Sequence, residues 1–153
     1  MIVGLDPGIS GAIAFLKDNL EFIAVFDMPT MPLSKSKNQV NAAALAKIIR
    51  LHPWPMTAYL EAVSAMPKQG VSSMFSFGTS YGIVQGVLAA LDIPTVLIRP
   101  QVWKVRAGLR GADKDMARTL AQRLYPMAEL SRKKDIGRAD AILIARFAIE
   151  SHN

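Results

Sequence analysis

The first sixteen residues, MIVGLDPGISGAIAFL, constrain the fold most, because they place one carboxylate, Asp6, between two apolar runs. Pro7-Gly8 and Ser10-Gly11 are turn-forming pairs, so the stretch predicts a β-hairpin whose first strand is 2–6. That strand is apolar on both faces, which is typical of a strand inside a sheet. A buried charge there is unfavourable unless a cation or hydrogen bonds compensate it. Asp6 is therefore expected either to cap the Pro7-Gly8 turn or to belong to a charged site.

Composition predicts a single globular domain, 1–153, that binds a polyanion. The chain has no cysteine, no signal-peptide pattern and no apolar run near the roughly 20 residues of a membrane span, so we expect a cytoplasmic protein without a membrane partner. The net charge is +6, and eleven of the eighteen Lys and Arg residues, but only four of the twelve Asp and Glu residues, lie between Arg99 and Arg138. Such a basic block is typical of nucleic-acid-binding proteins, although a solvated basic surface without a partner gives the same pattern.

Hydrophobic periodicity and turn residues predict an α/β fold with a five-stranded mixed sheet flanked by helices. Short turns join the first three strands into an antiparallel meander, and helices alternate with strands after it. The expected strands are 2–6, 11–17, 20–28, 57–63 and 94–99. The expected helices are 40–51, 74–91, 100–107, 112–124 and 137–151, and 29–39 and 64–73 are expected to be loops. In this arrangement the first and fourth strands can be neighbours, and the last helix can cover them.

Two more acidic residues have apolar neighbours. Glu61 ends the fourth strand, although an exposed edge position would explain it as well. Asp140 shares a helix face with Leu143 and Ile144, although it would also complement the helix dipole from the first turn. With Asp6 these side chains would converge, and converging carboxylates have raised pKa values unless cations lie between them. Mg²⁺ prefers oxygen ligands, and two such ions roughly 4 Å apart would support phosphodiester hydrolysis.

The helix at 74–91 carries a stripe of glycines on one face, at Gly78, Gly82 and Gly86. A glycine inside a helix costs about 1 kcal/mol relative to alanine, so three in register indicate that something packs very close to this face. The sheet of the same chain and the same helix of a second subunit are equally compatible partners.

Five motifs follow one another along nearly the whole chain: GLDPGISGAIAF (4–15), YLEAVSAMPKQGVSSMFSFGTSYG (59–82), RPQVWK (99–104), GADKDMARTLAQRL (111–124) and GRADAILIA (137–145). In order and spacing they resemble the Holliday-junction resolvases of the RuvC type, in the ribonuclease H-like superfamily. The stretch AMPKQGVSSMFSFG (65–78) is more similar to phage or prophage members than to housekeeping bacterial ones.

The resemblance implies a ribonuclease H-like nuclease domain and a homodimer that cuts four-way DNA junctions symmetrically. It implies Mg²⁺ or Mn²⁺ as the cofactor, with two ions per active site, and assigns metal binding and catalysis to Asp6, Glu61 and Asp140. It also implies that the helix with the glycine stripe joins the two subunits. This favours the same helix of a second subunit, rather than the sheet of the same chain, as the packing partner of the stripe.

The chain departs from the family pattern at two places. The family usually has an acid or a histidine three residues before the last aspartate, where this chain has Gly137. Asp135 is the nearest substitute as a fourth metal-binding and catalytic acid, unless it is a solvent-exposed loop residue. The aromatic residue that bacterial members carry just after the second acid is replaced by Ser64, and Met66 is the candidate for its role at the junction.

The resemblance also points to basic residues near the scissile phosphate. Lys114 would stabilise the developing charge or assist the attacking water, whereas Lys104 is expected to make a generic phosphate contact. The full set expected to bind DNA is Lys68, Lys104, Arg110, Lys114, Arg132, Lys133, Lys134 and Met66.

Two other functions remain compatible with the sequence. One is a different nuclease with the same fold, such as the YqgF type that trims ribosomal RNA precursors or a broad branched-DNA nuclease. The other is a non-catalytic module that binds branched nucleic acid, which the loss of the usual fourth acid leaves open.

Overall fold

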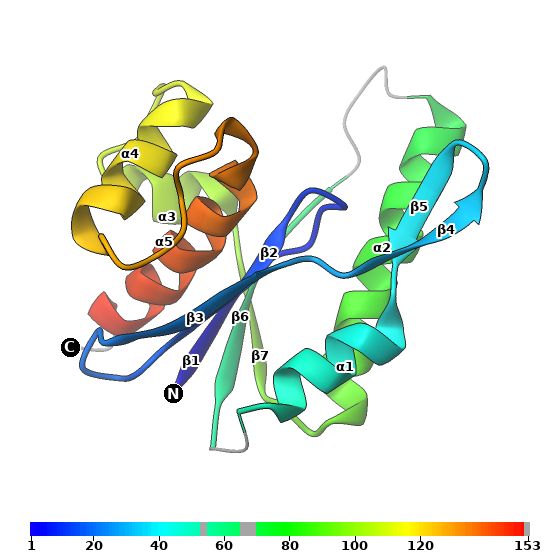
Figure 1. Cartoon of the computed structure of the whole chain (residues 1–153), viewed down its shortest axis with the longest axis horizontal. Helices are drawn as coiled ribbons and strands as arrows, with labels where there is room; N and C mark the ends of the chain where they lie inside the picture. The colour runs from blue at the N-terminus through cyan, green and yellow to red at the C-terminus, as the bar shows by residue number, and fades with distance from the viewer. Residues whose placement is uncertain (53–54, 65–69, 152–153) are drawn as a thin grey trace.

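A computed structural model describes residues 1–52, 55–64 and 70–151. Its centre is a five-stranded mixed sheet in the order β3-β2-β1-β6-β7 (Figure 1). The strands are β1 (Ile2–Asp6), β2 (Ala12–Leu16), β3 (Phe22–Asp27), β6 (Thr57–Glu61) and β7 (Thr95–Ile98). The first three pair antiparallel, whereas β6 runs parallel to β1 and to β7. The predicted mixed sheet, with the first and fourth predicted strands as neighbours, is confirmed.

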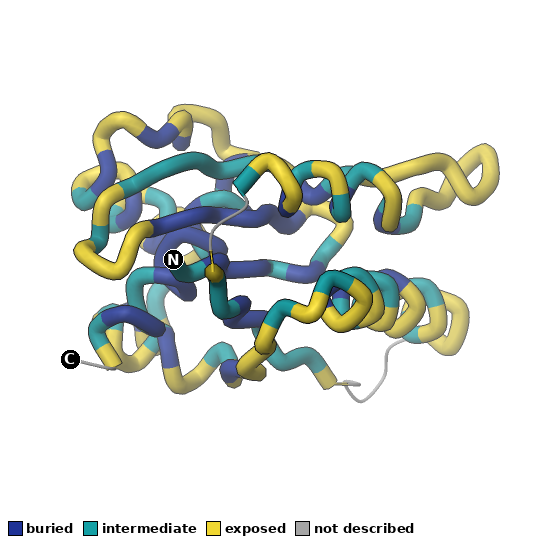
Figure 2. Tube along the Cα trace, turned by 90° about the horizontal axis from the view of Figure 1, so that it is seen from below, coloured by how far each residue is buried: buried dark blue, intermediate teal, exposed yellow. Residues whose placement is uncertain are grey.

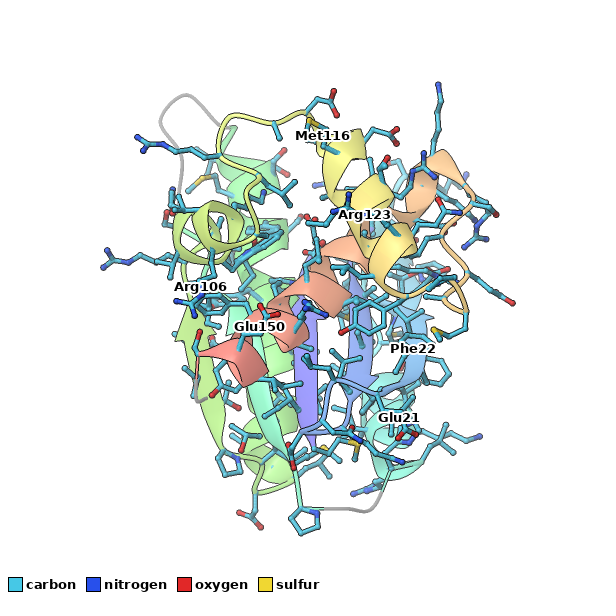
Figure 3. All side chains as sticks on the ribbon, turned by 90° about the vertical axis from the view of Figure 1, so that its left-hand side faces the viewer. Glu21, Phe22, Arg106, Met116, Arg123 and Glu150 are labelled. Atoms are coloured by element: carbon cyan, nitrogen blue, oxygen red, sulfur yellow. The ribbon has the colours of Figure 1, made fainter. Side chains whose placement is uncertain are left out.

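Helices cover both faces of the sheet and bury a core on each side (Figures 1 and 2). The first layer holds α3 (Pro100–Arg106), α4 (Lys114–Leu124) and α5 (Ile136–Glu150), and the second holds α1 (Ala42–Arg50) and α2 (Val71–Ala90). Figure 3 views the first layer, where Arg106 of α3 donates to the backbone carbonyl of Glu150 at 3.3 Å. Among the described residues, no helix combines the length and the apolar character needed to cross a bilayer.

The helices begin close to the predicted positions. The Asn41 side chain accepts a hydrogen bond from the Ala44 backbone N–H at 3.1 Å and so caps α1. The largest difference is at α2, which begins at Val71, three residues before the predicted start. Gly70 is its N-cap, and the polar Ser72 and Ser73 that suggested a loop form its exposed first turn.

The prediction of a loop over 29–39 is wrong, because this segment is a second hairpin of β4 (Thr30–Ser34) and β5 (Lys37–Val40) beside α2 (Figure 1). β4 is exposed along its whole length, so no alternating apolar pattern marks it. Contacts with α2 hold the hairpin instead. Lys37 Nζ donates to Ser72 Oγ at 2.6 Å, and the Val40 backbone N–H donates to Ser80 Oγ at 3.4 Å.

The close crossing of α5 over β1 positions the functional site. A Cβ atom built on Gly4 would overlap the backbone carbonyl of Ala141 and would lie 2.7 Å from the Ala145 nitrogen. Only glycine therefore lets the two backbones approach this closely. The contact lies two residues before Asp6 on β1 and one residue after Asp140 on α5, so it brings these two acids to the same place.

Candidate active site

Asp6 is the last residue of β1. The sequence left two roles open for its carboxylate, a cap of the following turn or part of a charged site, and the structure gives it both. Its Oδ1 accepts a hydrogen bond from the Gly8 backbone N–H at 3.2 Å, so it caps the turn that follows. Burial nevertheless raises the pKa of Asp6, while the Gly8 hydrogen bond and the charge of Lys104 offset part of this effect. Asp6 is thus a turn cap and also a largely desolvated acid beside a lysine.

Glu61 is the last residue of β6, and strand register places it at the same sheet end as Asp6. Leu5 and Leu60 pair in parallel, so the next residue on each strand is one of the two acids. Burial raises the pKa of Glu61, and the nearby charge of Asp6 raises it further. The indole N–H of Trp103 and the charge of Lys104 oppose this rise, the former through a 3.0 Å hydrogen bond to Glu61 Oε1.

Asp140 lies near the start of α5, on the face that packs over the sheet. Burial, together with the charges of Asp6 and Glu61, raises its pKa to about 7, although Lys104 and Lys114 counteract part of the rise. Its Oδ1 is buried and has no hydrogen-bond partner within 1–52, 55–64 and 70–151. Native proteins rarely leave a buried polar oxygen in this state, so the atom marks a place where a ligand or a proton is needed.

Chain segments more than fifty residues apart thus bring Asp6, Glu61 and Asp140 into mutual electrostatic contact, as predicted. The three are not drawn together into a preformed cage, because no group of three His, Cys, Asp or Glu side chains in the described segments is arranged to hold a metal ion. The donor chemistry nevertheless fits a hard divalent cation. All three donors are carboxylates whose pKa values are raised by burial, and neighbouring negative charge adds to this rise at Glu61 and Asp140. One buried oxygen, Oδ1 of Asp140, is unpaired among the described residues.

Two lysines contribute positive charge to this site. Lys104, on α3, has its Nζ 5.1 Å from the centre of the Trp103 ring, and its charge acts on all three acids. A phosphate contact by Lys104 stays a prediction. Lys114 is the first residue of α4 and acts on Asp140 alone among the three acids.

The structure does not support Asp135 as a fourth metal ligand, and it is not a solvent-exposed loop residue either. The side chain is 1% exposed and is held by Arg132, whose Nη2 donates to Oδ1 at 2.6 Å and whose backbone N–H donates to Oδ2 at 2.7 Å. Burial alone would raise the pKa of Asp135, but these hydrogen bonds outweigh it and the pKa lies below its usual value. Asp135 closes the short 3-10 helix η1 (Lys133–Asp135), and none of the three site acids has it among its charge partners.

Gly137 also has a structural reason for carrying no acid. A Cβ atom at this position would overlap the Ser10 carbonyl and would lie 2.9 Å from the Gly11 Cα atom. The β1–β2 turn therefore fills the space in which a fourth acidic side chain would begin. The site has three carboxylates because the start of α5 and this turn pack backbone against backbone.

The predicted DNA-binding residues differ in whether their charged groups are exposed to solvent or paired with an acidic side chain. Arg110, Lys114, Lys133 and Lys134 are exposed, whereas the charge of Arg132 is committed to Asp135 at 2.6 Å. Lys68 and Met66 lie outside the described residues.

The glycine stripe of α2 faces away from the sheet of its own chain. A Cβ atom built on Gly78, Gly82 or Gly86 would meet nothing within 4 Å. The buried residues of α2, Ser80, Val84 and Leu88, lie on its other side. Packing against the chain's own sheet, one of the two partners considered for the stripe, is therefore excluded.

Trp103 is a site residue that the sequence did not reveal. Its partner Glu61 lies 42 residues earlier, so no local spacing connects the two. The one sequence signal that could have indicated its role is its position, because Trp103 lies at the start of a helix that directly follows a strand.

Comparisons with known proteins agree with this architecture. No family model matches the chain. The chain is 33% identical over 111 residues to the chloroplastic Holliday junction resolvase MOC1 of Chlamydomonas reinhardtii, a match that covers 71% of this chain and 13% of that protein. Thermus thermophilus RuvC in complex with a Holliday junction substrate superposes with a TM-score of 0.69 at 15% identity, covering 99% of this chain and 94% of that one.

A second structure of Thermus thermophilus RuvC gives a TM-score of 0.60 at 14% identity, over 99% of this chain and 95% of that one. At such identities the structural matches establish the fold, and the MOC1 match adds a relationship in sequence. The chain therefore has the fold of RuvC and is similar in sequence, over 111 residues, to part of a Holliday junction resolvase.

Proposed function

We propose that this protein is a structure-selective endonuclease that resolves four-way DNA junctions by metal-dependent phosphodiester hydrolysis, making symmetric nicks. The observation that carries the proposal is the convergence of Asp6, Glu61 and Asp140, with raised pKa values, beside Lys104 and Lys114. The likeness to a resolvase and to a RuvC structure bound to a junction supports this choice of substrate.

Asp6, Glu61 and Asp140 would hold the cofactor, Mg²⁺ or Mn²⁺. When bound, two such ions would supply activation of a water molecule and stabilisation of the leaving oxygen. The crossing at Gly4 holds the backbones of β1 and α5 together, so Asp6 and Asp140 would be available to the same cation. At neutral pH the Asp140 carboxyl would release its bound proton as the cation replaces it.

The two lysines act on the substrate. The charge of Lys104 acts on all three acids, so Lys104 would attract the scissile phosphate, whose negative charge the acids repel. Lys114, exposed at the start of α4, acts on Asp140 and would stabilise the developing charge on the phosphate or assist the attacking water.

The test is cleavage of a labelled mobile four-way junction with Mg²⁺ by the wild-type protein and by Asp6→Asn. We expect the wild type to nick opposing strands and to leave linear duplex and RNA intact. Asp6→Asn should bind the junction without cutting it. Equal cutting of duplex or RNA would instead identify a broader nuclease of the same fold, and binding without metal-dependent cutting by the wild type would identify a non-catalytic binding module.

We also propose a homodimer joined through α2, because two symmetric nicks need two active sites and the glycine stripe is exposed. We expect Gly82→Leu to dissociate this dimer, since the leucine would separate two closely packed helices. The substitution meets nothing within 4 Å in its own chain, so the monomer should still fold. Sedimentation velocity and a thermal melt measure both effects, with Gly82→Ala as the control for size. A folded Gly82→Leu protein that still sediments as a dimer would place the interface elsewhere.

The basic surface near η1 is expected to bind phosphates through Lys133 and Lys134. Replacing both with alanine should weaken binding to any DNA and reduce the slope of log K against log[salt] by about 0.9 for each lost contact. Arg132→Ala is a contrasting variant, because it removes the guanidinium that donates to the buried Asp135 carboxylate but keeps the backbone N–H donor of residue 132 and the ion pair with Arg138 at 3.9 Å. It should lower stability by about 1 to 3 kcal/mol, the range for a lost hydrogen bond to a charged group. Salt titrations of junction binding measure the slope, and an unchanged slope in Lys133→Ala/Lys134→Ala would show that this surface does not touch phosphate.

A further inference from the structure

Trp103 joins two parts of the site that the sequence motifs leave separate. Glu61 pairs with Ile98 across the β6–β7 ladder, and α3 begins at Pro100, immediately after β7. The first turn of α3 therefore starts beside the carboxylate of Glu61. Trp103 lies in that turn, is 0% exposed, and packs in the core between the sheet and α5.

The side chain of Trp103 contacts two site residues at once. Its indole N–H donates to Glu61 Oε1 at 3.0 Å, and the Nζ of Lys104 lies 5.1 Å from the ring centre. The first contact fixes an oxygen of a metal-binding candidate, and the second is within the range of a cation–π interaction. No other side-chain hydrogen bond to Glu61 is found among the residues that the structure describes.

We propose that Trp103 is a positioning residue that prepares Glu61 to bind the divalent cation, an inference that rests on the proposed nuclease function. A free glutamate side chain loses rotamer freedom when it binds a ligand, at a cost of up to about 2 kcal/mol. The buried indole restricts Glu61 beforehand and occupies one of its two oxygens. The other oxygen is then directed to the metal, in the way that hydrogen-bonding partners outside the ligand set orient metal ligands elsewhere.

The same contact explains why the chain uses tryptophan here. Phenylalanine would fill most of the volume and retain a ring under Lys104, but it has no N–H group. A smaller donor on α3 would be shorter and would leave a cavity in the core. Among natural side chains, tryptophan combines a buried body with a donor only, so it cannot compete with Glu61 as a metal ligand.

The experiment removes the N–H and nothing else. The chain has two tryptophans, so a Trp54→Phe background leaves Trp103 as the only one. Biosynthetic replacement of Trp103 by 3-benzothienylalanine exchanges the indole N–H for sulfur in a ring of nearly the same shape. Mn²⁺ affinity is measured by electron paramagnetic resonance of the free ion, without DNA. We expect about tenfold weaker Mn²⁺ binding than in the Trp54→Phe protein, the low end for loss of such an orienting partner.

Two further measurements separate positioning from a purely structural role. Excess Mg²⁺ should restore most of the junction-cleavage rate of the substituted protein, because only ion binding has been weakened. In Glu61→Gln the amide oxygen still accepts from Trp103, so this matched control should fold normally and lose more Mn²⁺ affinity than the benzothienyl protein.

The outcomes distinguish the inference from the function on which it rests. Unchanged Mn²⁺ affinity with a lower melting temperature would show that the hydrogen bond only ties α3 to β6, and the inference would be wrong while the nuclease proposal stood. A Trp54→Phe protein that neither binds Mn²⁺ nor cuts junctions would overturn both.

Discussion

Asp140→Asn is expected to abolish junction cleavage and, at the same time, to raise the thermal stability of the metal-free protein at about pH 8. The loss of activity should be about a thousandfold or more, because a ligand that supports metal catalysis is worth several kcal/mol of transition-state stabilisation. The gain in stability has a separate origin. The folded protein buries Asp140 near Asp6 and Glu61, which raises its pKa to about 7 from an ordinary value of 3.8.

The sign of the pH dependence follows from this raised pKa. Between about pH 4 and pH 7 the folded state holds a proton on Asp140 that the unfolded state releases, so stability falls as the pH rises through this window. Above about pH 7 the carboxylate is charged in both states and the full penalty, on the order of a few kcal/mol, remains. Asparagine carries no charge at any of these pH values and therefore avoids the penalty.

Thermal melts of the wild type and of Asp140→Asn, from about pH 5 to about pH 8, measure the difference. The comparison of the two proteins matters because Asp27, Asp115 and Asp135 have lowered pKa values, which make stability change with pH in the opposite sense. Mg²⁺ should raise the melting temperature of the wild type more at the higher pH, and should have little effect on Asp140→Asn. Two melting curves that stay parallel across the pH range would contradict the burial of a charged Asp140.

Gly4→Val is expected to be the most destabilising single substitution near the site, by about 3 kcal/mol or more. The first added carbon would overlap the Ala141 carbonyl and crowd the Ala145 Cβ atom at 2.9 Å. These are atoms of a helix packed on the sheet, so the overlap is relieved only by moving α5 away from β1. Since α5 carries Asp140 and β1 carries Asp6, the cleavage rate should fall even where the variant remains folded.

Chemical denaturation measures the loss, and Gly8→Ala is the matched control. Its added carbon would lie 3.5 Å from the nearest atom, Asp6 Oδ1, which is an ordinary contact. We expect Gly8→Ala to change stability by less than about 1 kcal/mol, within the usual range for a tolerated surface change. A Gly4→Val protein as stable as Gly8→Ala would mean that α5 does not cross β1 as closely as described.

Much of the fold follows from short-range patterns. The apolar run before Asp6, the Pro7-Gly8 turn and the run after it form β1 and β2 as predicted, because strand alternation and turn chemistry act over a few residues. The same reasoning placed Asp140 on the inner face of α5. Short-range patterns did not predict the β4–β5 hairpin, because an exposed hairpin held by contacts with Ser72 and Ser80 has no apolar pattern of its own.

The sequence by itself determined the order of the five central strands and of the helices, and the identity of three acids in apolar surroundings, because burial periodicity is a local property of the chain. Only the tertiary structure decided which charges are free. Asp135 and Arg132 neutralise each other. The backbone of the β1–β2 turn occupies the space that a side chain at Gly137 would need. Trp103 donates a hydrogen bond to Glu61, which lies 42 residues earlier in the chain. These outcomes depend on how closely β1, α3 and α5 approach one another, and such distances are set by the packing of whole elements.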